Sequence, residues 1–188
     1  MYQTQLINLK SNKKKTYFAP EWNHYIFEGI VNDIDFSIIS KLILDNESKI
    51  KEEHQHSGYD GNTGLGDSLT SRFSFYNVLD WPNDEIYKLK QLIKIFHAKF
   101  LNELKLKVQS EMFIQCWANV MRKGQEIKIH SHSSDAFSYF GGNIVVKAKN
   151  TKTYYVNPLK YFDTLSRKNN IIESENVVGK LTLFNNYI

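Results

Sequence analysis

The sequence has little of several things that would place it in a special class of protein. It has a single cysteine, Cys116, which excludes an internal disulfide and a zinc site built from several cysteines, and which suits a reducing compartment. No apolar run approaches the roughly 20 residues that a membrane-spanning helix needs, and the N-terminal residues lack the apolar stretch of a secretory signal. We therefore expect a cytoplasmic protein with no membrane partner.

A strong charge imbalance is also missing. The 188 residues carry 24 Lys and Arg against 20 Asp and Glu, a net charge of +4, and 41% of them are hydrophobic, as in ordinary globular proteins. Lysines 13–15 hold much of the excess, and we expect them to be a solvated charge run rather than a clear nucleic-acid patch. With no repeat and no linker, the sequence predicts one domain over 1–188, helix-rich to about residue 108 and β-rich from about residue 111.

The first half has the pattern of helices with some strand. Residues 33–51 predict a helix that Asp33 or Asp35 caps, and residues 82–106 predict the clearest helix, with Asn83 or Asp84 as the cap before apolar residues at three- and four-residue spacing. Three further segments are expected: a strand over 24–31, a long Gly- and Asp-rich loop over 54–72, and a strand over 73–81.

From residue 111 the apolar period changes from 3.6 to 2, which is typical of strands. Met112, Ile114, Cys116, Ala118 and Val120 share one face, whereas Trp117 and Asn119 lie on the other. Residues 121–125 predict a turn. Strands are expected over 112–120, 126–130, 142–149, 152–158 and 180–186. Short strands that follow helices predict an α+β fold, with an antiparallel sandwich or barrel and the N-terminal helices packed on its outside.

Two histidines end the strand expected over 126–130. Side chains alternate along a strand, so His130 and His132 point to the same face if the chain stays extended, and Asp135 follows within three residues. Imidazole binds borderline divalent metals, and two histidines with one carboxylate form the facial triad of non-haem Fe(II) oxygenases. The alternative is a polar loop that binds no metal, in which Asp135 makes an Asx-turn.

The surrounding segments resemble two families that share one fold. The spacing from Gly124 through His130, His132 and Asp135 to Gly142 is similar to the first cupin motif, with an Asp one place before the usual Glu, but no second cupin motif follows. The chain resembles more closely the phage-encoded 2-oxoglutarate/Fe(II) oxygenase-like proteins. The segments that carry this resemblance, in order, are "GNTGLGDSLTSRF", "YNVLDW", the long helix, "IQCWANVMRKGQEIKIHSH", "FGGNIVV", "TYYVNP" and "GKLTLF".

This resemblance implies a double-stranded β-helix, the jelly-roll or cupin-like barrel, with Fe(II) as metal and 2-oxoglutarate as co-substrate. It also implies that the protein hydroxylates an unknown substrate. The reaction would take place in the cytoplasm, which is the host's cytoplasm if the gene belongs to a phage. His130 and His132 are the metal-ligand candidates, one of them in place of the usual carboxylate, and Asp135 competes with them. Trp117 and Asn119 are candidates to line the co-substrate pocket, although Trp117 can also be a core aromatic.

Two residues of the family pattern have no counterpart here. The distal iron-binding histidine and the arginine that pairs with 2-oxoglutarate follow "GKLTLF" in that family, and the sequence reaches Ile188 before either. Arg72, Arg122 and Arg167 have no position that selects one of them. Three explanations stay open: a longer protein, a degenerate member that kept the fold, or a partner chain or second copy that completes the open sheet edge.

Two functions compete with the dioxygenase. One is a non-catalytic viral structural or interaction protein on a degenerate oxygenase fold, which would bind neither metal nor 2-oxoglutarate. The other is a cupin-type metalloenzyme, which would bind metal and be indifferent to 2-oxoglutarate. The sequence selects no substrate, because nothing in residues 54–72 is specific for a base, a sugar, a peptide or a lipid.

Overall fold

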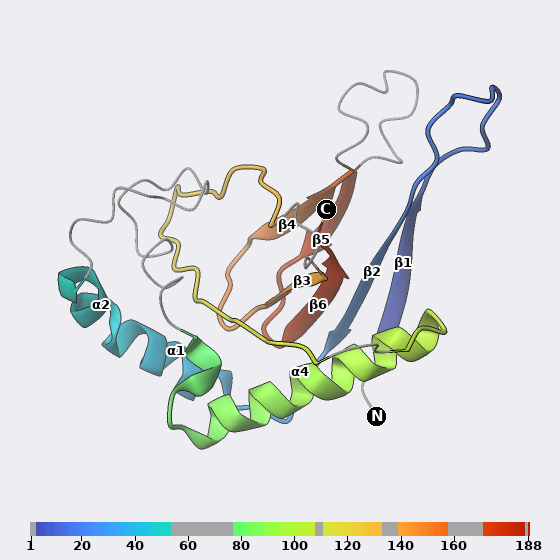
Figure 1. The fold of residues 1–188 in the computed structure, drawn as a ribbon. Coiled ribbons are helices and arrows are strands. Elements are labelled where there is room, and N and C mark those ends of the chain that lie inside the picture. Colours follow the sequence, from blue (N-terminus) through green and yellow to red (C-terminus); the bar gives the residue numbers. More distant parts are fainter. Residues whose placement is uncertain (1–2, 54–76, 108–110, 133–138, 158–170, 187) are drawn as a thin grey trace. The chain divides into compact units, whose positions relative to one another are not determined.

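The computed structural model describes residues 3–53, 77–107, 111–132, 139–157, 171–186 and 188 (Figure 1). They form helices and antiparallel sheets, so the predicted α+β class is confirmed. The chain divides into two compact units. We call the one made of Met1–Asp33 and Ser131–Ile188 the β unit, and the one made of Ile34–His130 the helical unit.

A four-stranded antiparallel sheet is the larger part of the β unit. Its strands, in spatial order, are β1 (Thr4–Lys10), β2 (Asn23–Ile30), β6 (Lys180–Asn185) and β3 (Phe140–Ile144). In the register, Ile26 of β2 lies opposite Ile7 of β1 and Phe184 of β6. Strands from both ends of the sequence therefore share one sheet, with β1 and β3 at its edges.

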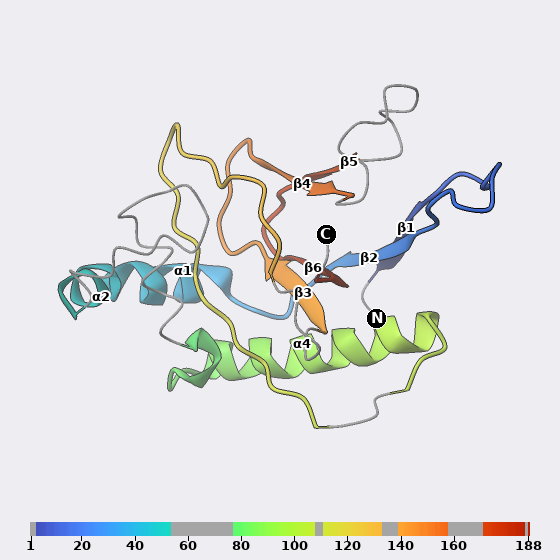
Figure 2. The same cartoon turned by 45° about the horizontal axis from the view of Figure 1, so that its top comes forward.

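The second sheet of the β unit is an antiparallel pair, β4 (Lys152–Val156) and β5 (Ile171–Glu175). This pair lies over one face of the larger sheet (Figure 2), and apolar side chains fill the space between them: Ile26, Tyr155, Phe184 and Ile188, with Ile7 and Ile172 at the margin. The face of the larger sheet that meets β4 and β5 is called the inner face below. Within the described residues the two sheets do not close into a barrel.

The strand predictions for the β unit are mostly confirmed. Four of the expected segments overlap an observed strand: 24–31 overlaps β2, 142–149 overlaps β3, 152–158 contains β4 and 180–186 contains β6. The sequence analysis missed β1 and β5. Both are short of buried apolar residues: in β1 only Leu9 is buried, and in β5 only Ser174. A strand that exposes most of its side chains has a weak alternating pattern, which explains both omissions.

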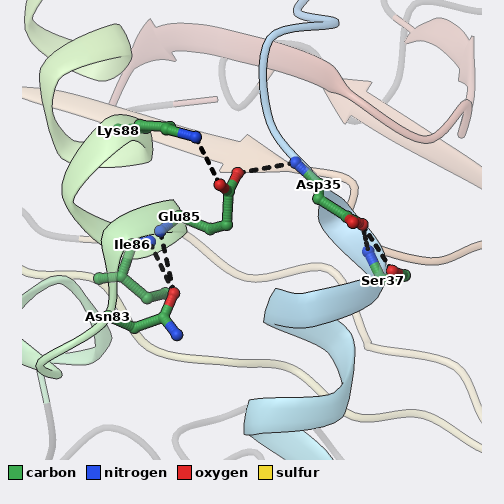
Figure 3. A network of polar contacts seen from close by, with 6 residues as sticks. All are labelled: Asp35, Ser37, Asn83, Glu85, Ile86 and Lys88. Atoms are coloured by element: carbon green, nitrogen blue, oxygen red, sulfur yellow. Dashed lines mark hydrogen bonds and ion pairs between the residues drawn. The ribbon is translucent and has the colours of Figure 1, made fainter.

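The helical unit begins with α1 (Phe36–Asp45) and α2 (Glu47–Glu53) and continues with the 3-10 helix η1 (Val78–Asp80) and α4 (Asp84–Glu103). Each predicted cap is found. The Asp35 carboxylate accepts a hydrogen bond from the Ser37 amide (2.9 Å), and the Asn83 side chain accepts from Glu85 (2.9 Å). Figure 3 shows how the two helix starts are joined, because the Glu85 carboxylate accepts from the Asp35 amide (2.8 Å).

Four predictions in this unit need correction, two of them in its first part. The helix expected over 33–51 is two helices, because the Asn46 side chain donates to the Leu42 carbonyl (2.8 Å) and ends α1. The strand expected over 73–81 is wrong where it is described, since 78–80 form η1, with the Asn77 side chain accepting from the Leu79 amide (3.3 Å). Residues 73–76, like the loop expected over 54–72, lie outside the described residues.

The strands expected over 112–120 and 126–130 are also wrong, because neither segment pairs with a strand in the described part of the chain. The Asn77 amide takes the place of a strand partner: it donates to the Ile114 carbonyl (3.0 Å) and accepts from the Cys116 amide (3.1 Å). Side-chain parity survives, since Ala118 is buried between exposed Trp117 and Asn119. The turn expected at 121–125 is confirmed by a hydrogen bond from the Gln125 amide to the Arg122 carbonyl (3.0 Å).

Candidate metal and cofactor site

The inner face of the β unit carries polar side chains at both ends of its apolar centre. Alternation along β2 places His24, Ile26 and Glu28 on this face, and the register sets Glu28 opposite Thr182. Glu28 and Thr182 are both buried. A buried carboxylate needs hydrogen-bond donors to offset its desolvation, so the groups around Glu28 decide what this end of the face can hold.

Those groups come from three other strands. Gln5 donates from Nε2 to the Glu28 carboxylate (2.5 Å), and the Ser174 hydroxyl donates to its second oxygen (3.0 Å). Lys180 then donates from Nζ to Ser174 Oγ (3.0 Å). The chain of contacts from Lys180 through Ser174 to Glu28 links a cation to a buried anion, which satisfies the carboxylate and fixes β5 to the sheet.

Tyr155 closes the same end of the inner face. Its hydroxyl donates to the Asn143 side-chain oxygen (2.9 Å), and its ring lies 5.2 Å from the Phe184 ring. Burial raises the pKa of Tyr155 to about 12, so the phenol stays protonated at neutral pH and acts as a hydrogen-bond donor.

His24 lies at the other end of the inner face, and the sequence analysis did not select it. Only 8% of its surface is exposed, and Asn185 donates from its side-chain nitrogen to His24 Nδ1 (3.1 Å). Burial lowers the pKa of His24, and a hydrogen bond with the fully buried Asn157 opposes that shift in part. The period-two pattern of β2 contained the signal, because it puts His24 on the same face as Ile26 and Glu28.

The structure places His132 against this inner face. Its ring centroid lies 6.0 Å from that of Phe184, the ring that also packs on Tyr155. The His132 side chain itself is exposed. One of the two predicted histidine ligands therefore stands beside the interior of the β unit.

His130 belongs to the helical unit, so the geometry of each histidine is defined within its own unit. His130 is half-buried, and its Nδ1 lies 2.8 Å from the Lys128 carbonyl. A carbonyl only accepts, so Nδ1 carries a proton and donates. In the neutral ring the lone pair is then on Nε2, and a metal-binding histidine commonly donates its other ring N–H to a carbonyl in this way.

The structure does not bring the other predicted site residues together in the part of the chain that it describes. Trp117 and Asn119 are both exposed, Trp117 with 37% of its surface accessible, and their role toward a co-substrate stays a prediction. Asp135 lies outside the described residues. Arg122 forms an ion pair with Glu47 (2.6 Å), whereas Arg72 and Arg167 also lie outside them.

Cys116, whose position on the apolar face of residues 112–120 predicts a core residue, is half-buried. Burial raises the pKa of its thiol to about 11, which keeps it protonated at neutral pH. Within the part of the chain that the structure describes, His, Cys, Asp and Glu side chains form no group of three that could hold a metal ion. No helix in that part is both long and apolar enough to cross a membrane.

Comparison with known proteins gives no further assignment: no protein-family model, curated protein or solved structure matches the chain.

Proposed function

We propose that the protein is an Fe(II)/2-oxoglutarate-dependent dioxygenase of the phage type, acting on an unknown substrate. The observation that carries this proposal is the position of His132, whose ring lies beside Phe184 on the inner face between two antiparallel sheets. In a double-stranded β-helix the metal site opens into the space between the two sheets. A candidate ligand beside this face supports the proposal of such a site.

The strand pairing supports the same fold. A jelly roll of eight strands pairs them in nested order, the fourth with the fifth, the third with the sixth, and so outward. Here β4 pairs with β5 and β3 pairs with β6, as the two innermost rungs of that scheme require.

The same scheme places one further strand beside β3 and one beside β4. Both β3 and β4 have an edge that no described strand occupies, and each of these edges would take its partner.

The donor set fits Fe(II). Two neutral imidazoles are good ligands for a borderline divalent metal, and His130 has the tautomer that presents Nε2. We assign His130 and His132 as ligands, with Asp135 as the competing carboxylate. When bound, the iron supplies O₂ activation coupled to decarboxylation of 2-oxoglutarate. The chain's own part is to supply the two imidazoles, with His132 beside the apolar centre of the β unit, which excludes water.

The experiment is metal loading of the full chain under anaerobic conditions, followed by desalting and elemental analysis. We expect stoichiometric iron in the wild type, and its loss in His130→Ala and in His132→Ala. The control is His97→Ala, which removes a half-buried histidine of α4 and should leave the iron content unchanged. Iron retained by both site variants would show that the ligand assignment is wrong.

A further inference from the structure

The loop that joins β1 to β2 carries exposed aromatic and lysine side chains that have no role in the fold or the proposed metal site described above. Its base is closed by a hydrogen bond from the Ser11 amide to the Trp22 carbonyl (3.0 Å), and Trp22 is buried. From this base the loop, in blue, extends past the ends of β1 and β2 (Figures 1 and 2). We call residues 10–21 the arm.

The tip of the arm is a tight turn with two aromatic residues at its centre. The Ala19 amide donates to the Thr16 carbonyl (3.3 Å), so Tyr17 and Phe18 occupy the two central positions of the turn. Their side chains are 86% and 91% exposed. Turn centres usually carry Gly, Asn, Asp, Ser or Pro, and two large rings there gain nothing from burial. The rings therefore belong to no core among the residues that the structure describes.

The arm also concentrates the positive charge of the protein. It contains four lysines, at positions 10, 13, 14 and 15, against one acid, Glu21, and so carries three of the chain's four net positive charges. All four lysines are exposed. Lys14 is held by Glu21 (3.1 Å), which leaves the other three as the cations that a bound anion would meet first. The lysines alone predict a solvated charge run; the exposed rings beside them are what the structure adds.

We propose that the arm binds single-stranded nucleic acid, with phosphates on Lys10, Lys13 and Lys15 and bases stacked on Tyr17 and Phe18. Lysines that follow a backbone and aromatic rings that stack bases are the two components of such sites. The proposal does not depend on the metal site.

The geometry of the two rings favours a single strand over a duplex. Their planes meet at 85° with centroids 5.2 Å apart, an edge-to-face pair, so each ring keeps a face open in a different direction. Bases of a flexible strand can splay to meet both faces, whereas the bases of a duplex stay stacked on each other. A membrane surface is a poorer partner, because no Leu, Ile, Val or Met lies within the arm to extend the apolar area beyond the two rings.

The experiment measures fluorescence anisotropy of labelled oligo-dT and oligo-U with the full chain at 50 mM salt and above. We expect the double variant Tyr17→Ala/Phe18→Ala to lose tenfold or more in affinity for both oligonucleotides. The control is Tyr87→Ala/Phe113→Ala, which removes an equally large pair of exposed rings elsewhere and should bind as the wild type does. Circular dichroism confirms that each variant is folded.

A second pair of variants tests the lysines. Lys13→Ala/Lys15→Ala should reduce the slope of log affinity against log salt by about 1.4, because each phosphate contact on a single strand contributes about 0.7. The control is Lys147→Ala/Lys149→Ala, two exposed lysines outside the arm, which should leave the slope unchanged.

Any one of the following results would overturn the proposal. The first is no binding of either oligonucleotide by the wild type at 50 mM salt, or equal binding by the ring variant. The second is equal affinity for a duplex of the same length. The third is binding to vesicles of phosphatidylserine and phosphatidylcholine that depends on Tyr17 and Phe18, without binding to oligonucleotides, which would assign the arm to a membrane surface.

Discussion

At the scale of single residues, side-chain alternation is confirmed for part of residues 112–120: it put Trp117 on the face opposite Cys116 and Ala118, and Ala118 is buried between exposed neighbours. The shared face of His130 and His132 stays a prediction, because residues 126–130 do not form a strand. Alternation did not single out His24, because one histidine on a strand is most often a core residue. Only the register with β6 reveals that Asn185 donates to its ring.

The buried position of His24 predicts a pH dependence. Its pKa is lowered from the ordinary 6.5, so the unfolded chain takes up a proton at a higher pH than the folded chain. The stability that neutral His24 contributes is thus fully present above about pH 6.5 and lost as the pH falls through the folded pKa. Ring-proton NMR should show His24 titrating below 6.5, and the urea midpoint should fall between pH 7.5 and 5.5.

Single substitutions show how much each histidine contributes to this pH dependence. Burial also lowers the pKa of His97, so His24→Gln should remove part of the fall in the urea midpoint and His97→Gln another part. A His24 ring that titrates at or above 6.5 would contradict the buried geometry.

The thiol of Cys116 is expected to react slowly in the native protein. With its pKa raised from 9.0 to about 11, the thiolate fraction at pH 8 is about a hundredfold smaller than in the unfolded chain. The reaction of the native protein with a disulfide reagent such as DTNB should be slower by at least that factor than its reaction in urea. Equal rates in the native and unfolded protein would show that the thiol is accessible.

At the scale of elements, the predictions held where the signal is local. The helix α4 has its cap, its first-turn acids and its apolar spacing within its own residues, and it was predicted to within a few residues. Strand pairing depends on residues far away in the chain. The segment 112–120 alternates as a strand should, yet its backbone contacts the Asn77 side chain, and no pattern within the segment could predict that contact.

The α4 cap gives a direct test of this local signal. Asn83 accepts hydrogen bonds from the amides of Glu85 (2.9 Å) and Ile86 (3.4 Å), so Asn83→Ala leaves two helix-start donors without their partner. We expect it to lower the free energy of unfolding by about 1 kcal/mol, measured by urea denaturation. The control is Asn102→Ala in the last turn, where the side chain is exposed and the expected change is within about 0.5 kcal/mol. Equal effects of the two substitutions would contradict the cap.

At the scale of the whole molecule, the two ends of the sequence form one unit. β1 pairs with β2, β2 with β6 and β6 with β3, although residues 31–179 separate β2 from β6. The sequence analysis expected β2 as a strand of the first half but could not predict its pairing with β6, because the pairing of distant strands is decided by long-range packing. The nested pairs β4–β5 and β3–β6 are the feature on which the proposed fold, and with it the proposed chemistry, depends.

The measurement that tests the proposed function most directly is an anaerobic titration of the full chain with Fe(II) and then 2-oxoglutarate, followed by UV-visible absorption. We predict a charge-transfer band that needs both additions and that His132→Ala abolishes while His97→Ala does not. Iron bound without a response to 2-oxoglutarate would favour the cupin-type metalloenzyme instead. Neither iron nor 2-oxoglutarate bound would contradict the dioxygenase and leave a scaffold that kept the fold alone.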